Sequence, residues 1–213
     1  IVVSLNGNTI RVTGELPATF TGTIPYWASV ETVDGKRMLT VVYPAASGAS
    51  AGLDTPGRFT VVTATPFRPN GMAYPRSGPT FVNWGGFPFM AYNGGIAFHG
   101  PITFTPDGTE NGERVYDWYL QRGPVSHGCN RMQGEHVVEL AHLIGVNMRN
   151  TWASGSKTTK RVKITVTRDY DRLPSGEAVD VAYPRSNGAR APSGPTRVFP
   201  TWDAEEMTQV VCA

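Results

Sequence analysis

The chain is short of cysteines, of charge and of long apolar runs, and each shortage excludes a class of protein. Only Cys129 and Cys212 occur among its 213 residues, so a disulfide framework is excluded, because their one possible intrachain bond would consume the thiol discussed below. No apolar run approaches the length of a membrane-spanning helix. Charged residues make up 17% of the chain, and a net charge of +2 without a dense Lys/Arg run argues against a nucleic-acid partner.

Glycine and proline are abundant instead, with 24 and 17 residues, alongside many β-branched and aromatic side chains. This composition favours a β-rich fold with many turns over a helical bundle, and it excludes disorder. A chain of this length predicts one domain with a sizeable core and at most a small appendage. The sequence opens on strand-like residues without an initiator methionine, so we expect a processed product that has lost a signal peptide.

Turn signals divide much of the chain into short strands. Asn6-Gly7 and Asp34-Gly35 each lie between two strand-like segments and predict tight hairpins, because both dipeptides accept the positive φ of such turns. Brevity, alternation and aromatic content favour strand over helix elsewhere as well. The predicted strands are residues 1–5, 9–13, 28–33, 38–43, 60–63, 80–84, 87–92, 96–99 and 161–167.

The sequence predicts one helix, shortly after Cys129. Apolar residues recur at helical spacing over 137–144, and Gly145 suits the left-handed residue that ends a helix. Asn130 and Gln133 resemble a capping pair at its start. We therefore expect Cys129 to lie close to the helix N-terminus, whose partial positive charge favours a thiolate.

The candidate chemistry gathers in residues 124–132. Cys129 lies there two residues after His127 and two residues before Arg131. Only the thiolate of a cysteine is a strong nucleophile, and cationic neighbours stabilise it. Gly128 allows the backbone to approach the group that the sulfur attacks. The pattern indicates an enzyme that transfers acyl groups through a cysteine.

Two histidines compete for the role of general base. His127 is so near Cys129 in sequence that it reaches the sulfur only if the backbone folds tightly, whereas His99 can point at the thiol from a neighbouring strand. We therefore expect His99 to be the base and His127 to support it. The backbone N–H groups of Gly128 and Cys129 are the expected oxyanion donors, and Arg131 can hold a substrate carboxylate.

We expect no metal ion and no cofactor. A zinc site built from His99, His127, Cys129 and His136 is the alternative, but these spacings match no common ligand pattern. His136 and His142 lie six residues apart, so they face different sides of the predicted helix. We expect both to be solvated or structural.

Several motifs together carry a family resemblance. Ser126-His127-Gly128-Cys129-x-Arg131-Met132, preceded by Phe98-His99-Gly100, resembles the catalytic signature of the L,D-transpeptidases that cross-link bacterial peptidoglycan. Thr55-Pro56-Gly57-x-Phe59 resembles a conserved turn of the same family. The resemblance implies a mainly β, β-sandwich-like catalytic domain over residues 1–170 with one helix after the cysteine. Residues 171–213 would form an extension that is packed on this domain or flexible.

The resemblance also implies a reaction. Cys129 would attack the L,D bond before the terminal D-Ala of a tetrapeptide stem, release D-Ala, and pass the stem from a thioester to an amine acceptor. The base would be His99, with oxyanion N–H groups from Gly128, Cys129 and His127. Carbapenem-type β-lactams acylate this cysteine in many members. The implied partners are peptidoglycan stem peptides, and the implied location is the periplasm or the cell wall; no oligomeric state follows.

Two departures from the family pattern concern the substrate. Asn130 follows the cysteine where the family usually has an aliphatic residue, and the segment 100–125 is longer than usual, which predicts an enlarged lid. We expect the substrate site to be lined by Arg131, Ser126, Asn130, Tyr92 and Trp118. The lid residues expected to meet the amine of an acceptor are Asp107, Glu110, Glu113 and Asp117.

Three other functions remain open. Hydrolysis of the same thioester would make the chain an L,D-carboxypeptidase. A catalytically silent module that binds the cell wall would tolerate loss of the thiol. A papain-like protease is disfavoured, because it needs a cysteine near the N-terminus with its histidine downstream, whereas His99 precedes Cys129 here.

Overall fold

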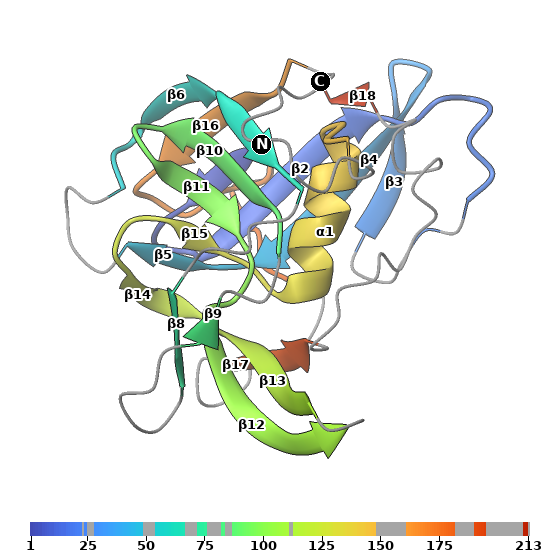
Figure 1. Cartoon of the computed structure of the whole chain (residues 1–213). Helices are drawn as coiled ribbons and strands as arrows, with labels where there is room; N and C mark the ends of the chain where they lie inside the picture. The colour runs from blue at the N-terminus through green and yellow to red at the C-terminus, as the bar shows by residue number, and fades with distance from the viewer. Residues whose placement is uncertain are drawn as a thin grey trace.

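The computed structural model describes residues 1–22, 24, 28–48, 54–66, 72–75, 82–83, 87–110, 113–147, 161–181, 190–194 and 211–212. Side chains are described for these residues except 72–75, 82–83, 104–110, 113–118, 190–194 and 211–212. Strands dominate the described residues, which contain one α-helix, so the predicted mainly β, sandwich-like fold is confirmed (Figure 1). No helix within these ranges is long and apolar enough to cross a membrane.

The largest sheet has seven strands and mixes parallel with antiparallel pairs. Its strand order is β3 (Ala28–Val33), β4 (Lys36–Pro44), β2 (Thr9–Glu15), β1 (Val2–Ser4), β16 (Lys163–Thr167) and β6 (Gly57–Thr60), while β18 (Val211–Cys212) pairs with β2. The buried sides of these strands carry aliphatic residues that alternate with more exposed ones, as in β2.

A second, six-stranded sheet contains the signature residues. Its strand order is β14 (Gly123–Ser126), β5 (Ala46–Gly48), β15 (Asn130–Arg131), β11 (Ile96–His99), β10 (Phe89–Asn93) and β7 (Thr63–Thr65). Here β15 runs parallel to β11, whereas β10 is antiparallel to it. Two strands that are distant in sequence therefore lie side by side at the centre of this sheet.

The expected lid is a β-hairpin and not an irregular loop. Strands β12 (Thr103–Glu110) and β13 (Glu113–Gln121) pair antiparallel and belong to a third sheet with β17 (Arg190–Gly194), β8 (Met72–Pro75) and β9 (Val82–Asn83). The hairpin extends away from the two larger sheets, at the bottom of Figure 1. The expected contact of its four acidic side chains with an acceptor amine lies outside the described side chains.

Both predicted N-terminal hairpins form. The turn between β3 and β4 has positive φ at Asp34 (51°) and Gly35 (76°), as the dipeptide predicts. In the turn between β1 and β2, however, the residue with positive φ is Asn8 (48°) and not Asn6 or Gly7. The Ser4 hydroxyl accepts a hydrogen bond from the Gly7 N–H (2.9 Å), which fixes this wider turn without a left-handed glycine.

The single helix in the described residues, α1 (Gly134–Leu143), begins three residues earlier than its apolar pattern predicts. Its N-cap is Gln133, which makes no side-chain capping hydrogen bond, so the predicted Asn130–Gln133 capping pair is wrong. Strand β15 lies between Cys129 and the helix in the chain, and the expected closeness of the thiol to the helix N-terminus remains a prediction. Gly145 ends the helix with φ 77°, as expected.

The helix packs on the seven-stranded sheet and completes the main core. The Tyr43 hydroxyl on β4 donates a hydrogen bond to Glu139 on α1 (2.6 Å), and both side chains are fully buried. His136 and His142 are 2% and 3% exposed, so neither side chain is solvated. Of the two expected roles, the structural one remains. The His136 ring lies 5.1 Å from the Tyr43 ring between centroids.

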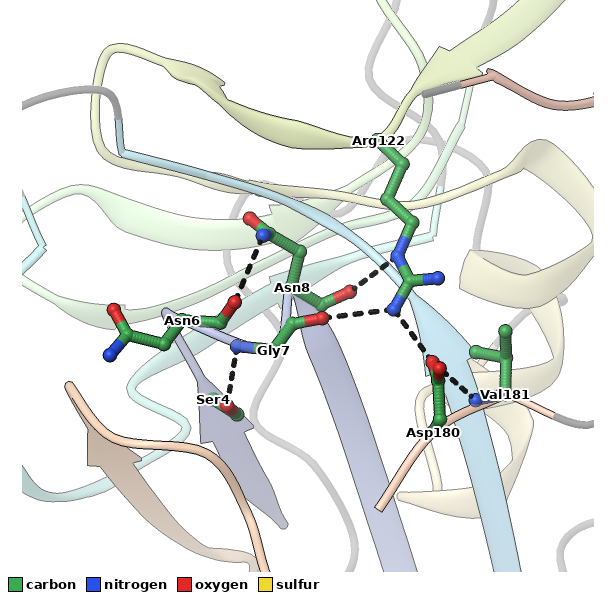
Figure 2. A network of polar contacts seen from close by, with 7 residues as sticks. All are labelled: Ser4, Asn6, Gly7, Asn8, Arg122, Asp180 and Val181. Atoms are coloured by element: carbon green, nitrogen blue, oxygen red, sulfur yellow. Dashed lines mark hydrogen bonds and ion pairs between the residues drawn. The ribbon is translucent and has the colours of Figure 1, made fainter. Parts of the chain in front are cut away.

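An arginine connects the two larger sheets next to the signature. The Arg122 guanidinium donates to the carbonyls of Gly7 (2.9 Å) and Asn8 (3.2 Å) in the β1–β2 turn and to the Asp180 carboxylate (3.0 Å) (Figure 2). Arg122 directly precedes β14, which leads to Ser126. The described part of the C-terminal region therefore contacts the main sheets, while the division at residue 170 remains a prediction.

Candidate active site

Two parallel strands place the segments that carry Cys129 and His99 side by side. In the β11–β15 pair, Phe98 lies beside Asn130 and His99 beside Arg131. Paired residues of neighbouring strands project to the same face, and successive residues alternate between faces. Because Cys129 directly precedes β15, its side chain belongs to the face of Arg131 and His99. The expectation that the histidine arrives on a neighbouring strand is confirmed.

His99 is held in one tautomer. Its Nδ1 lies 2.7 Å from the Gly100 carbonyl oxygen, and a carbonyl only accepts hydrogen bonds, so Nδ1 carries the proton. The neutral ring then presents Nε2 as the proton acceptor, which is the form a general base needs. The ring is 3% exposed and stacks on Phe89, with centroids 5.9 Å apart and planes at 14°.

Close packing against Phe87 requires glycine both directly after His99 and at the start of α1. A Cβ at Gly100 would collide with the Phe87 ring, and so would a Cβ at Gly134, the first residue of α1. Phe87 is fully buried between them. The glycine after His99 is therefore required by the approach of an aromatic side chain, and the helix start is positioned by the same ring.

The turn that carries the thiol depends on Gly128. Its φ of 135° lies in the region that favours glycine, and its N–H donates to the Ser126 hydroxyl (3.2 Å). Cys129 is partly exposed, and its Sγ lies 3.7 Å from the Gly95 carbonyl oxygen. His127 is exposed on this turn. To act as an oxyanion donor, the Gly128 N–H would have to exchange the Ser126 hydroxyl for the substrate oxygen.

The five expected substrate residues do not share one environment. Arg131 is half-buried on the face of His99. The side chains of Ser126, Tyr92 and Asn130 are 1%, 2% and 0% exposed, and the Ser126 hydroxyl, the Tyr92 hydroxyl and Asn130 Nδ2 bond to other protein groups. The structure therefore does not bring these three to an open substrate surface. The side chain of Trp118 lies outside the described part of the chain.

Asp54 is a site residue that sequence reasoning missed. Its carboxylate accepts hydrogen bonds from Asn130 Nδ2 (3.0 Å to Oδ2) and from the Tyr92 hydroxyl (3.3 Å to Oδ1), and Asn130 directly follows Cys129 in the chain. The available signal was its place immediately before Thr55-Pro56-Gly57. Burial raises the pKa of this carboxyl above its ordinary value, and the two hydrogen bonds offset part of that effect.

Tyr92 is affected by the same cluster. Burial raises the pKa of its hydroxyl, and the negative charges of Asp54 and of a thiolate at Cys129 raise it further. The hydroxyl therefore stays protonated and serves as a hydrogen-bond donor. Among the residues that the structure describes, no group of three or more His, Cys, Asp or Glu side chains could hold a metal ion.

The fold and the paired Cys129 and His99 define the class, a mainly β domain with a cysteine–histidine site. The model of the L,D-transpeptidase catalytic domain family (YkuD) matches residues 28–181, which is most of the chain and includes both residues. The chain belongs to this family, which acts on peptidoglycan. Comparison with curated proteins and with solved structures gave no significant match.

Proposed function

We propose that the protein is a peptidoglycan L,D-transpeptidase that uses Cys129 as its nucleophile and His99 as its base. The observation that carries the proposal is the His99 ring. Its Nδ1–H is committed to the Gly100 carbonyl, which leaves Nε2 to accept a proton on the face of the sheet that carries the partly exposed thiol. Membership of the L,D-transpeptidase catalytic domain family supports the same chemistry.

The first half-reaction forms a thioester. Nε2 of His99 takes the thiol proton, and the sulfur of Cys129 adds to the carbonyl carbon of the L,D peptide bond before the terminal D-Ala of a stem tetrapeptide. Backbone N–H groups of the Gly128–Cys129 turn stabilise the oxyanion that develops. The carbon–nitrogen bond then breaks, and the proton held by His99 passes to the departing amine of D-Ala.

The second half-reaction returns the thiol. An amine of a second stem gives a proton to His99 as its nitrogen attacks the thioester carbonyl. The carbon–sulfur bond breaks, and Cys129 recovers the proton from the imidazolium. Water in place of the amine would make the enzyme an L,D-carboxypeptidase, because it would release a tripeptide stem from the same intermediate.

The half-buried Arg131 has a place in this scheme. Its guanidinium can make bidentate hydrogen bonds to a carboxylate, and its position beside His99 in the strand register supports a role in binding the substrate. We assign it to a carboxylate of the donor stem. The substrate implies an extracytoplasmic location, in the periplasm or the cell wall, and carbapenem-type β-lactams would acylate Cys129.

Mass spectrometry of muropeptides incubated with the protein tests the proposal. The wild type should produce cross-linked dimers with release of D-Ala, and Cys129→Ala should produce none. Cys212→Ala is the matched control, because it removes the only other thiol, and it should retain the wild-type products. Tripeptides alone would identify the carboxypeptidase, whereas equal activity of wild type and Cys129→Ala would exclude the cysteine mechanism.

A further inference from the structure

Three buried polar side chains from distant segments meet in one cluster, and one of them belongs to Asn130, the residue after the cysteine. Asp54 precedes β6, Tyr92 lies on β10 and Asn130 on β15, and they are 2%, 2% and 0% exposed. Asn130 Nδ2 donates to Asp54 Oδ2 (3.0 Å) and to the Tyr92 hydroxyl (2.6 Å). The Tyr92 hydroxyl lies 3.3 Å and 3.4 Å from the two oxygens of Asp54. We call these three residues the buried triad.

The hydrogen atoms of the buried triad can be assigned one by one. The two on Asn130 Nδ2 point to Asp54 and Tyr92, and the one on the Tyr92 hydroxyl points to Asp54. Asp54 thus accepts from both partners, which suits a carboxylate without its own proton. Asn130 Oδ1 is buried without a hydrogen-bond partner in the described structure. The amide is therefore oriented by its two donors alone.

The buried triad and the catalytic face share one strand. Asn130 lies between Cys129 and Arg131, and its register partner is Phe98, whereas the partner of Arg131 is His99. Side chains alternate between the faces of a strand, so holding Asn130 on the core side directs its two neighbours to the side of His99. Tyr92 is close enough for a thiolate at Cys129 to influence its hydroxyl.

Stability alone does not account for this arrangement. A fully apolar cluster would fill the same space without a buried carboxylate and without an unsatisfied amide oxygen, and such replacements are often neutral or stabilising. Buried polar clusters that leave a group unsatisfied are expected where function requires them. Residue 130 is also where this chain departs from the aliphatic residue usual in the family.

We propose that Asp54, Tyr92 and Asn130 are positioning residues, which fix the rotation of β15 so that Cys129 and Arg131 both face His99. The inference rests on the proposed acyl transfer at Cys129. None of the three side chains touches the substrate. They act through the backbone of residues 129–131, where a displacement of about 1 Å can lower a rate by roughly 100-fold.

The test uses four variants of the full chain. Tyr92→Phe and Asn130→Leu each remove one member of the buried triad. The triple variant with Asp54→Val, Tyr92→Phe and Asn130→Leu removes all polar groups at once, so no orphaned donor or acceptor remains. Tyr43→Phe is the matched control, because it removes a tyrosine hydroxyl from another buried carboxylate, Glu139, away from the cysteine.

Four quantities are measured for each variant: the acylation rate with a stem tetrapeptide, the KM for that tetrapeptide, the acylation rate with a carbapenem, and the melting temperature. Alkylation of Cys129 by iodoacetamide reports thiol access. We expect Tyr92→Phe and Asn130→Leu to lower acylation at least tenfold with KM and alkylation changed less than about threefold. The triple variant should melt within a few degrees of the wild type and still acylate slowly. Tyr43→Phe should acylate at the wild-type rate.

Two results overturn the inference. One is acylation within twofold of the wild type in both single variants; the other is a triple variant that regains acylation together with its melting temperature, as a merely structural cluster would. The proposed function fails separately, when the wild type itself is acylated by neither the tetrapeptide nor the carbapenem. A wild type that reacts, beside variants that react equally well, contradicts the positioning role alone.

Discussion

Two buried tyrosine–carboxylate contacts in this fold have similar chemistry and different surroundings. Tyr43 donates to Glu139 at 2.6 Å between a strand of the large sheet and α1, while Tyr92 contacts Asp54 at 3.3 Å in the sheet that carries Cys129. The first contact is short and lies in the main core. The second is longer, is shared with Asn130, and borders the site. The comparison indicates that the first contact stabilises the fold and the second orients the nucleophile.

The largest expected effect is the stability loss in Tyr43→Phe. It removes the short hydrogen bond to the Glu139 carboxylate, and hydrogen bonds to charged groups contribute roughly 1.5–3 kcal/mol. We expect a decrease of that size in the free energy of unfolding, measured by urea denaturation at pH 7, with no change in the acylation rate. If Tyr43→Phe lowered the acylation rate as much as Tyr92→Phe does, the two contacts would not have different roles.

The next largest expected effect is a loss of folding stability at acid pH, caused by His136 beside the Tyr43–Glu139 contact. Burial lowers the pKa of His136, whose ring lies tilted against that of Tyr43, to about 3. In the unfolded state the pKa of this side chain is about 6.5, so at acid pH the unfolded chain binds a proton that the folded chain does not bind. The contribution of His136 to the free energy of unfolding is therefore complete above pH 6.5 and is lost as the pH falls toward 3. We expect the free energy of unfolding to fall by about 2 kcal/mol between pH 7 and pH 5.

His136→Phe provides the control for this acid effect, because it keeps an aromatic ring at the same place without a titrating nitrogen. Urea denaturation of this variant at both pH values should show a much smaller decrease. Glu135, whose carboxylate lies 3.8 Å from His136 Nε2, also has a pKa raised by burial and remains in both proteins. A decrease that persists in His136→Phe would assign the acid sensitivity to other groups.

Tyr92→Phe should cost less stability than Tyr43→Phe, about 1 kcal/mol, because its contacts with Asp54 are long and the short hydrogen bond that it accepts from Asn130 joins two uncharged groups. The order of the two variants should therefore differ between the two experiments. Tyr43→Phe should have the lower free energy of unfolding in urea, and Tyr92→Phe should have the lower acylation rate. Parallel measurements on the same preparations check this inversion. The same order in both assays would count against separate roles.

The smallest expected effect concerns Asp54, whose contribution to the free energy of unfolding depends on pH in the direction opposite to that of His136. Burial raises the pKa of Asp54 above 3.8, so its folded state holds a proton more tightly than the unfolded chain. Its stability contribution is complete below pH 3.8 and is lost as the pH rises through the folded-state pKa. In the His136→Phe background, replacing Asp54 by Asn should flatten the pH dependence of unfolding at the acid end. An unchanged slope would exclude Asp54 as its source.

Local patterns predicted much of the fold. Alternation and turn dipeptides located β1 to β4, β10, β11 and β16, and helical periodicity located α1 to within three residues. The predicted strand over residues 60–63 is wrong, because residues 61 and 62 connect β6 to β7. The relation between His99 and Cys129 was also predictable, because it needs only a strand that ends at the histidine and lies beside the signature. These features depend on residues that are close in sequence or on a single strand pairing.

Other features depend on distant partners and escaped prediction. Asn130 was expected to cap α1, yet its amide bonds to Asp54 and Tyr92, which are 76 and 38 residues away. The segment 100–125 was expected to form a long lid because of its length, yet it contains the paired strands β12 and β13, whose register shifts between Pro106 and Thr109. A local pattern cannot report an irregularity that a partner strand accommodates.

The three-point anchorage of Arg122 has a consequence for how such enzymes diversify. Its guanidinium fixes the chain between the β12–β13 hairpin and the strand that leads to the signature (Figure 2). A change of length or sequence in the hairpin should therefore displace the backbone only as far as Arg122, and not the strand that leads to the thiol. Related chains could therefore vary the hairpin sequence while keeping the same backbone position at the start of β14.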